Sequence, residues 1–182
     1  MEYLFRDLRE DEIECRVAQC TEKGVSLLLY KDARCDMNIL DETVGPFNWM
    51  RSHSRENANC TVSIKDAGTD FWVSKEDTGT ESNTEAAKGL ASDSFKRACF
   101  NWGIGRELYT APFIWVGAEA AGVKPDKSGR PKCYESFAVE RIVIENKVIK
   151  ALSLINAKTG KRVFVWQDPV FAARNAGKKV QQ

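Results

Sequence analysis

The chain has 182 residues, of which 43% are hydrophobic and 29% charged, and its formal net charge is +1. This composition is typical of one folded domain with a small appendage, and no apolar run approaches the roughly 20 residues of a membrane span. Because nucleic-acid binders are usually basic overall, such a function would require positive charge that is gathered locally or repeated by the assembly of many subunits.

The cysteine and histidine content argues against a metal site. Six cysteines are scattered without a CxxC pair, and His53 is the single histidine. A zinc site needs several such ligands at close spacing, so we expect no metal, and intracellular free thiols are the default. Cys35 and Cys99 are predicted to be small buried apolar groups. The first residues are acidic, so we expect no signal peptide and a cytoplasmic location in a bacterial host cell.

The first part of the chain alternates short strands with turns. Strands are predicted at residues 13–19, 25–30, 49–55, 60–65 and 71–74. Residues 32–44 are predicted to be helical instead, because Met37, Leu40 and Val44 recur at helical spacing before Gly45 and Pro46 stop the run. Together these segments predict an antiparallel β-meander with a helix inserted in it.

A long amphipathic helix is predicted between Thr84, a candidate N-cap, and Gly103, a candidate stop. At about 100° per residue, one face collects apolar residues: Ala87, Ala91, Phe95, Ala98 and Trp102. Lys96 and Arg97 lie on the opposite face, and Lys88 lies at the edge of the apolar stripe. Residues 76–79 before this helix are interpreted as a turn.

The C-terminal third combines a loop, further strands and a basic tail. Residues 117–132 are rich in Gly, Pro and Lys and are predicted to be a flexible loop. Strands are predicted at residues 137–144, 148–155 and 162–166, and they either extend the main sheet or form a small β appendage. After Asp168 no acidic residue remains, whereas Arg174, Lys178 and Lys179 do. This tail could contact a second DNA segment or a partner protein, or it could be a solvated end.

The chain lacks the sequence motifs of common enzymes. It has no GxxxxGK[ST] phosphate loop, no GxSxG and no HExxH. Neither a catalytic residue nor a cofactor is therefore expected. A metal-dependent nuclease stays open as an alternative, because a set of acids lies beside a lysine in the sequence: Asp70, Lys75, Glu76 and Asp77.

Lys96 and Arg97 are the strongest candidates for binding a polyanion. They are adjacent on the polar face of the long helix, where an arginine fork and a lysine point charge could meet successive phosphates. The alternative is a solvated face with an ion pair between Asp93 and Arg97 at i, i+4. Aromatic residues surround this part of the sequence; most of them are expected to be core residues, and one or two could stack on bases.

Four segments resemble the phage single-strand annealing proteins, which belong with the annealing domain of the eukaryotic double-strand-break repair annealing protein. They are YKDAR (30–34), LDETVGPFNW (40–49), FWVSKEDTGTESNTEAAKG (71–89) and SDSFKRACFNWGIGRELY (92–109). The similarity covers residues 10–115 and is weaker from 117 to 182. It implies a β-meander packed on one long helix and assembly into rings or helical filaments. In that family a groove holds single-stranded DNA by its backbone, with the bases turned outward.

The resemblance also implies the site residues. Lys96 and Arg97 match the lysine–arginine pair that lines the groove, Arg34 matches a basic position of the first helix, and Lys88 matches another on the long helix. These four residues are the predicted DNA-binding set. One departure is Phe100, where eukaryotic members carry a further arginine, so a one-for-one map of phosphate contacts is not expected.

The predicted function is ATP-independent binding and annealing of single-stranded DNA in homologous recombination and repair, in a protein of phage or prophage origin. The partners would be the complementary strand, further copies of the chain, a single-strand-binding protein and a phage exonuclease. A DNA-end-protecting or coating protein of the same fold is the main alternative. The expected organisation is an annealing and oligomerisation core (1–116), a flexible loop (117–132), a β-rich extension (133–166) and a basic tail (167–182).

Overall fold

The computed structural model describes residues 3–80 and 86–179, and it gives side chains for these residues except 86–88 and 177–179. The chain forms two compact units, each built from separate stretches of sequence. Unit 1 comprises Met1–Leu8 and Lys31–Arg106, and unit 2 comprises Arg9–Tyr30 and Glu107–Gln182. Each unit therefore depends on segments that are distant in the sequence. None of the described helices is long and apolar enough to cross a membrane.

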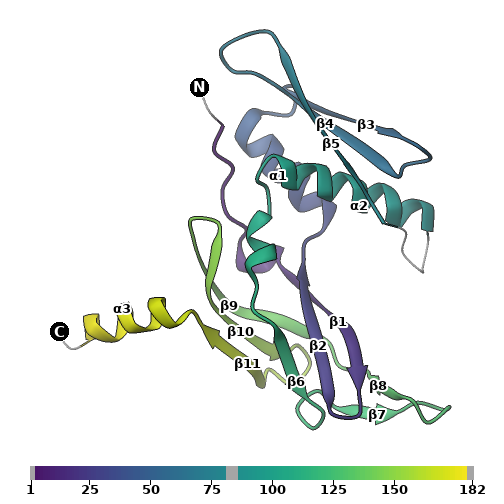
Figure 1. The fold of residues 1–182 in the computed structure, drawn as a ribbon, viewed down its shortest axis with the longest axis vertical. Helices are drawn as coiled ribbons and strands as arrows, with labels where there is room; N and C mark the ends of the chain where they lie inside the picture. The colour runs from purple at the N-terminus through teal and green to yellow at the C-terminus, as the bar shows by residue number, and fades with distance from the viewer. Residues whose placement is uncertain (1–2, 81–85, 180–182) are drawn as a thin grey trace. The chain divides into compact units, whose positions relative to one another are not determined.

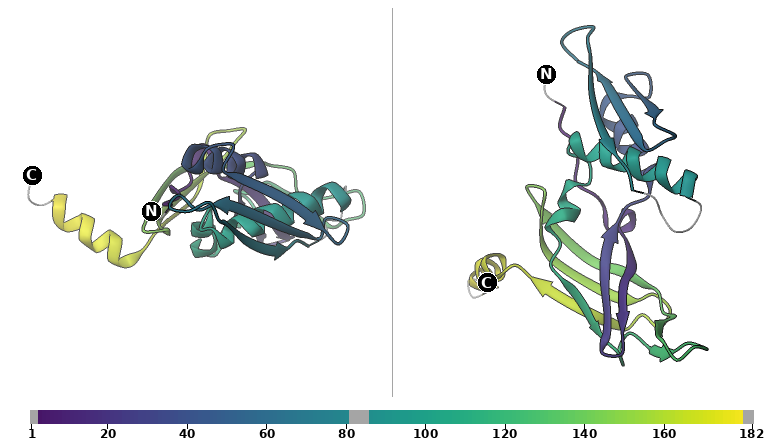
Figure 2. Two further views of the ribbon diagram at one scale, coloured as in Figure 1. Left: turned by 90° about the horizontal axis from the view of Figure 1, so that it is seen from above. Right: turned by 45° about the vertical axis from the view of Figure 1, so that its right-hand side comes forward.

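Unit 1 is a three-stranded antiparallel sheet with two helices (Figure 1). Its elements are α1 (Ala33–Val44), β3 (Trp49–Ser54), β4 (Asn59–Lys65), β5 (Trp72–Thr78) and α2 (Ala86–Asn101). The strand order is β3-β4-β5. Helix α2 packs against β4 and β5, and α1 packs against α2. Figure 2 shows α2 running beside this sheet in two further views.

Alternation along β4 explains this packing, because successive side chains of a strand point to opposite faces. Cys60, Val62 and Ile64 are almost completely buried, whereas Thr61 and Ser63 between them are only partly buried. From α2, Phe95 and Ala98 are fully buried, which confirms the predicted apolar stripe at these two positions. Cys35 and Cys99 are buried as well, as predicted, and all six cysteines are free thiols.

Unit 2 is built on a six-stranded antiparallel sheet in the order β11-β10-β9-β1-β2-β6. Its strands are β1 (Glu14–Thr21), β2 (Gly24–Tyr30), β6 (Ile114–Gly117), β9 (Phe137–Glu145), β10 (Val148–Asn156) and β11 (Arg162–Gln167). A separate hairpin consists of β7 (Val123–Pro125) and β8 (Pro131–Cys133), and α3 (Pro169–Lys179) follows β11. Short 3-10 turns lie at Glu10–Glu12 (η1) and Arg106–Thr110 (η2).

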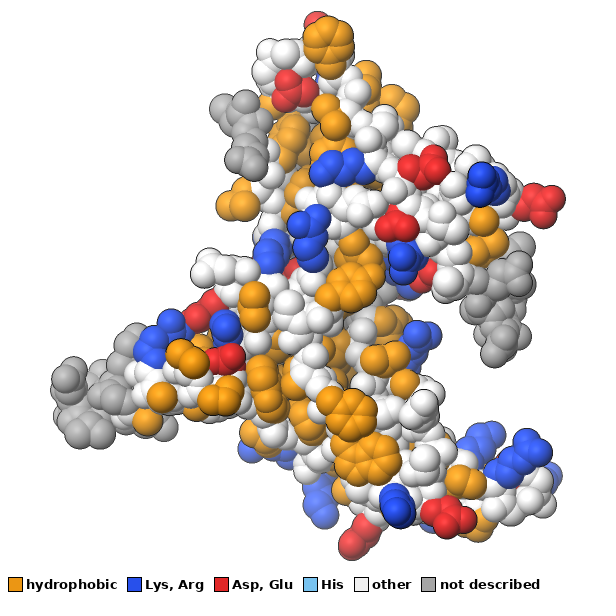
Figure 3. All heavy atoms as spheres, viewed as in Figure 1, with side chains coloured by type: hydrophobic (Ala, Val, Ile, Leu, Met, Phe, Trp, Pro, Cys, Tyr) orange, Lys and Arg blue, Asp and Glu red, His pale blue; other side chains and the backbone are white. Residues whose placement is uncertain are grey.

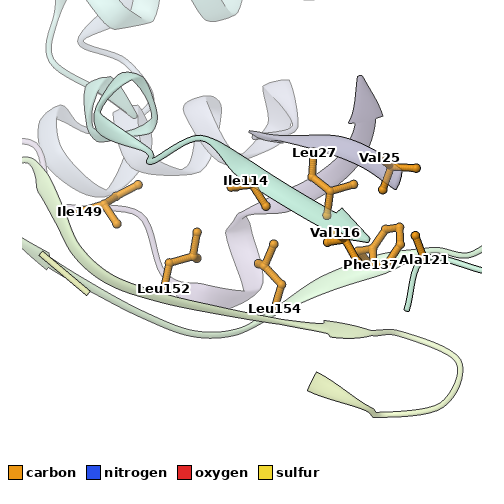
Figure 4. Packing of buried hydrophobic residues seen from close by; sticks show 9 residues of the cluster. All are labelled: Val25, Leu27, Ile114, Val116, Ala121, Phe137, Ile149, Leu152 and Leu154. Atoms are coloured by element: carbon orange, nitrogen blue, oxygen red, sulfur yellow. The ribbon is translucent and has the colours of Figure 1, made fainter. Parts of the chain in front are cut away.

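The core of unit 2 is formed where β2 and β6 face the β9–β10 pair (Figure 4). Its buried members are Val25, Leu27, Ile114, Val116, Ala121, Phe137, Ile149, Leu152 and Leu154. Most of these are branched aliphatic residues, which fit the pleated surface of a sheet. The strands predicted after residue 133 therefore belong to the larger sheet, because β9 pairs directly with β1.

Several expectations about the fold need correction. The single β-meander is wrong, because the strands separate into two main sheets that are assembled by non-local pairing. Residues 76–78 continue β5 and do not form a turn, and residues 117–132 include β7 and part of β8. The tail contains α3, so the described chain has three α-helices, of which α2 is the longest with 16 residues. The candidate N-cap Thr84 lies outside the described residues.

Candidate nucleic-acid interface

Three of the four predicted DNA-binding residues have described side chains, and all three lie in unit 1. Arg34 is in the first turn of α1, and Lys96 and Arg97 are in the middle of α2. We call these three residues the cationic ledge. Lys88 lies in α2, but its side chain is outside the described part of the molecule. Its role therefore stays a prediction.

Asp32 organises the first side of the ledge. Its Oδ1 accepts a hydrogen bond from the Arg34 backbone N–H at 2.8 Å, which makes Asp32 the N-cap of α1. Its Oδ2 lies 2.6 Å from Arg34 Nη2. The hydrogen bonds from the Arg34 side chain and backbone lower the pKa of Asp32, and the charge of Lys96 lowers it further. One carboxylate thus faces two of the three ledge cations.

Lys96 is the member of the ledge with the weakest attachment. Among the described residues it has no direct hydrogen bond or ion pair, and its charge acts on Asp32 and Asp36 at longer range. The side chain is partly buried rather than fully exposed. A lysine in this position retains its three N–H donors for an anionic ligand.

Arg97 faces a different carboxylate from Lys96. Its Nε lies 3.4 Å from Asp77 Oδ1 on β5, and 40% of its side chain is exposed. The Nε atom is buried and has no hydrogen-bond partner within the described chain, so this contact is an ion pair of poor geometry. The alternative pair with Asp93 is wrong, because the Asp93 carboxylate instead accepts a hydrogen bond from the Thr80 backbone N–H at 2.9 Å.

A buried ion pair behind the ledge was not predicted. Lys31 and Asp36 are 1% and 0% exposed, and the Lys31 ammonium bonds to Asp36 Oδ1. The same ammonium lies 4.4 Å from the centre of the Phe100 ring. Gly105 leaves room for this lysine, because a Cβ there would lie 2.2 Å from Lys31 Cε and the backbone has φ of +72°. The sequence signal was a lysine directly after the apolar strand that ends at Tyr30.

The aromatic residues of unit 1 divide into packed and exposed groups. Trp49 stacks on Phe95 with centroids 6.1 Å apart, and Trp102 donates a hydrogen bond to the Val62 carbonyl. In contrast, Phe47 and Phe71 are 91% and 77% exposed. The expectation that most aromatics near the long helix are core residues is wrong, because Trp72, Tyr109, Phe113 and Trp115 are exposed as well.

The acids considered for a nuclease site have separate partners. Asp70 pairs with Lys65, Glu76 accepts from Asn59 and Thr61, and Asp77 faces α2. Adjacent strand residues point to opposite faces, which separates Glu76 from Asp77. Across the described residues, no three His, Cys, Asp or Glu side chains are grouped closely enough to hold a metal ion.

The basic tail is partly neutralised. Arg174 Nη2 lies 2.6 and 2.7 Å from the two carboxylate oxygens of Glu145 in unit 2. The side chains of Lys178 and Lys179 lie outside the described residues. The proposed contact of this tail with DNA therefore stays a prediction.

Three cations on two neighbouring helices, two of them in direct ion pairs with Asp32 and Asp77, form a surface that can hold a polyanion. Residues 7–126 match the model of the Rad52/22 family double-strand break repair proteins, and the chain belongs to this family. This match confirms the resemblance carried by the sequence motifs.

A curated protein is also similar to part of this chain. The chain is 35% identical over 92 residues to the single-stranded DNA-binding protein DdrA of Deinococcus radiodurans. The aligned part is 50% of this chain and 44% of DdrA, so the chain spans less than half the length of that relative. No solved structure shows significant similarity to this chain.

Proposed function

We propose that this protein binds single-stranded DNA and anneals complementary strands without ATP, in recombination and double-strand break repair. Its setting would be the cytoplasm of a bacterial cell, and its origin a phage or prophage. The observation that carries the proposal is Lys96, a ledge lysine without a direct partner among the described residues, whose neighbours Arg34 and Arg97 are offset by Asp32 and Asp77. The family membership and the name of DdrA support it.

The modest charge of the ledge supports assembly into a ring or filament. Asp32 and Asp77 offset part of its positive charge, and the whole chain has a net charge of only +1. Each neutralised phosphate releases counterions, and on single strands it adds about 0.7 to the slope of log K against log salt. One subunit with three ledge cations would therefore bind weakly, whereas many copies along one strand would bind tightly. The sequence of the strands would be read by base pairing between them.

Variants of the ledge test this proposal directly. Lys96→Ala/Arg97→Ala should abolish binding of a labelled oligonucleotide, because it removes two phosphate contacts from every subunit along the strand. A matched control is Lys158→Ala/Lys161→Ala, because both lysines are exposed in unit 2 and have no ion pair among the described residues. The control should bind as the wild type does. Unchanged binding by the ledge variant, with both proteins folded by circular dichroism, would show that the ledge is not the binding site.

A DNA-coating or end-protecting protein is the second candidate, because DdrA is named for binding single-stranded DNA and not for annealing. Mixing complementary oligonucleotides with the protein separates the two functions. An annealing protein accelerates duplex formation without nucleotide, and a coating protein slows it. Electron microscopy of the same samples would show whether rings or filaments form, as the proposed assembly requires. Single-strand-binding protein and a phage exonuclease are proposed partners for pull-down experiments.

A further inference from the structure

The β7–β8 hairpin of unit 2 concentrates positive charge in a chain that is nearly neutral. Its eleven residues, 123–133, contain four basic side chains and one carboxylate. The basic residues are Lys124, Lys127, Arg130 and Lys132, and all four are exposed. Within the described chain none of them forms an ion pair. Figure 3 shows Lys and Arg side chains gathered over this hairpin at the lower right of the view.

The base of the hairpin is anchored in the core of its unit. Val123 and Cys133 pack against the hydrophobic core, next to the fully buried Ala121. The Val123 backbone N–H donates to the Ala118 carbonyl at 3.0 Å, and Cys133 Sγ donates to the Ala121 carbonyl at 3.1 Å. Strand β8 also packs beside β1. The exposed cations are therefore carried on a well-anchored backbone.

The single carboxylate of the hairpin is used to build its turn. Asp126 Oδ1 accepts hydrogen bonds from the Ser128 backbone N–H at 2.8 Å, from Ser128 Oγ at 2.7 Å and from the Arg130 backbone N–H at 3.0 Å. The bond from the Ser128 side chain is the main cause of the lowered pKa of Asp126. This acid stabilises the tip of the hairpin and forms no ion pair with the four cations.

Two of the cations are placed unfavourably for stability alone. Lys124 and Lys132 are direct partners in the β7–β8 register. Like charges directly opposite each other destabilise a strand pair. An anion that binds between the two ammonium groups would remove this repulsion. Such a local conflict is typical of a binding site, where function outweighs stability.

An exposed aromatic ring next to these cations favours nucleic acid over an acidic peptide. Tyr134 follows β8 directly and is 63% exposed, and Lys132 Nζ lies 5.0 Å from its ring centre. Stacking of a base on an accessible ring contributes about 1–3 kcal/mol in single-strand binding. Phosphates would meet the lysines and arginine while a base stacks on the tyrosine.

We propose that the β7–β8 hairpin is a second contact site for single-stranded nucleic acid, separate from the cationic ledge. The choice of nucleic acid as ligand rests on the proposed function, whereas the charge and exposure of the hairpin do not. The site would engage a second strand, or a further stretch of the same strand, through phosphates and one stacked base.

The first test compares two lysine pairs of unit 2. Lys124→Gln/Lys132→Gln should lower the slope of log K against log salt for an oligonucleotide by about 1.4 per subunit. The control Lys158→Gln/Lys161→Gln should leave the slope unchanged. Removal of the opposed lysines should not lower the melting temperature, so weaker binding cannot be attributed to unfolding. An unchanged slope in the hairpin variant would overturn the inference.

The second test identifies the ligand. An oligonucleotide with 5-iododeoxyuridine should photo-crosslink to the peptide that contains Tyr134, and Tyr134→Leu should abolish this crosslink. Polyglutamate serves as the competing acidic polymer. If polyglutamate binds the hairpin and the oligonucleotide does not crosslink there, the site takes an acidic protein and the inference is wrong. Failure of the proposed function is a different result, in which Lys96→Ala/Arg97→Ala binds DNA normally.

Discussion

Asp32 has two roles that can be separated by substitution, because it caps α1 and also opposes the ledge cations. Asn caps a helix about as well as Asp, whereas Ala costs about 0.5–2 kcal/mol at an N-cap. Asp32→Asn should therefore keep the hydrogen bond to the Arg34 backbone and remove the negative charge 2.6 Å from its guanidinium. Asp32→Ala should lose both.

The magnitudes follow from these contacts. For a chain of this size, Asp32→Ala should lower the melting temperature by roughly 1–8 °C, and Asp32→Asn should lower it less. An opposite charge at about 4 Å in water contributes roughly 1 kcal/mol, so its removal should tighten DNA binding up to about fivefold per subunit at low salt. Both variants should share this gain, and it should shrink in high salt because exposed charges are screened.

Thermal unfolding and fluorescence anisotropy of a labelled oligonucleotide measure the two effects. The pKa of Asp32 is lowered in the folded protein, so its ionised form stabilises the fold above the ordinary pKa of about 4, and this contribution is lost as pH falls through the folded value. The difference in stability between wild type and Asp32→Ala should therefore shrink in acid. If Asp32→Asn binds DNA no more tightly than the wild type at low salt, Asp32 does not oppose a DNA site.

Two further predictions concern the buried pair behind the ledge. Gly105→Ala should lower the free energy of unfolding by at least about 1–2 kcal/mol, because it places a side chain at φ +72° and against Lys31. Urea titration measures this loss, and an unchanged free energy would contradict the close contact between Gly105 and Lys31. Lys31→Met should cost about 3–5 kcal/mol near pH 8, because it leaves the buried Asp36 carboxylate unpaired. Burial raises the pKa of Asp36 to about 6, and loss of Lys31 should raise it further. At pH 5 the carboxyl group of the variant is then protonated, so the variant should recover stability there. An equal loss of stability at both pH values would refute this reasoning.

Local sequence signals predicted most of the elements of this fold. The strands β1, β2, β9 and β10 were indicated by periodicity, and α1 stops at Val44 with Gly45 as its C-cap, as expected, where φ is 84°. The sheet arrangement was not predictable in the same way. The pairing of β2 with β6 joins Leu27 to Ile114, and no local pattern encodes a partner so distant in sequence. The four residues of β6 and the three of β7 and of β8 are also too few for a periodic signal.

The candidate site shows the same limit. Lys96 and Arg97 were identified from their position on the polar face of a helix and from the family motif. Asp77, which pairs with Arg97, and Asp32, on which the charge of Lys96 acts, come from other parts of the chain and required the three-dimensional arrangement. The ion pair of Lys31 and Asp36 was missed because a lysine and an aspartate five residues apart look like ordinary surface residues in sequence.

The order in which the ribosome releases the strands has a consequence for biosynthesis. The β1–β2 hairpin is complete at Tyr30, but β6, which covers its edge, begins only at Ile114. At about 5–20 residues per second, this delay is roughly 4–17 s, and Val25 and Leu27 lack their core neighbours from β6, β9 and β10 during that time. During this interval the nascent chain exposes the apolar face of the β1–β2 hairpin and the unpaired edge of β2, which can bind chaperones or aggregate. Synonymous codons that slow translation between these two strands should therefore reduce the soluble yield, although they leave the final molecule unchanged.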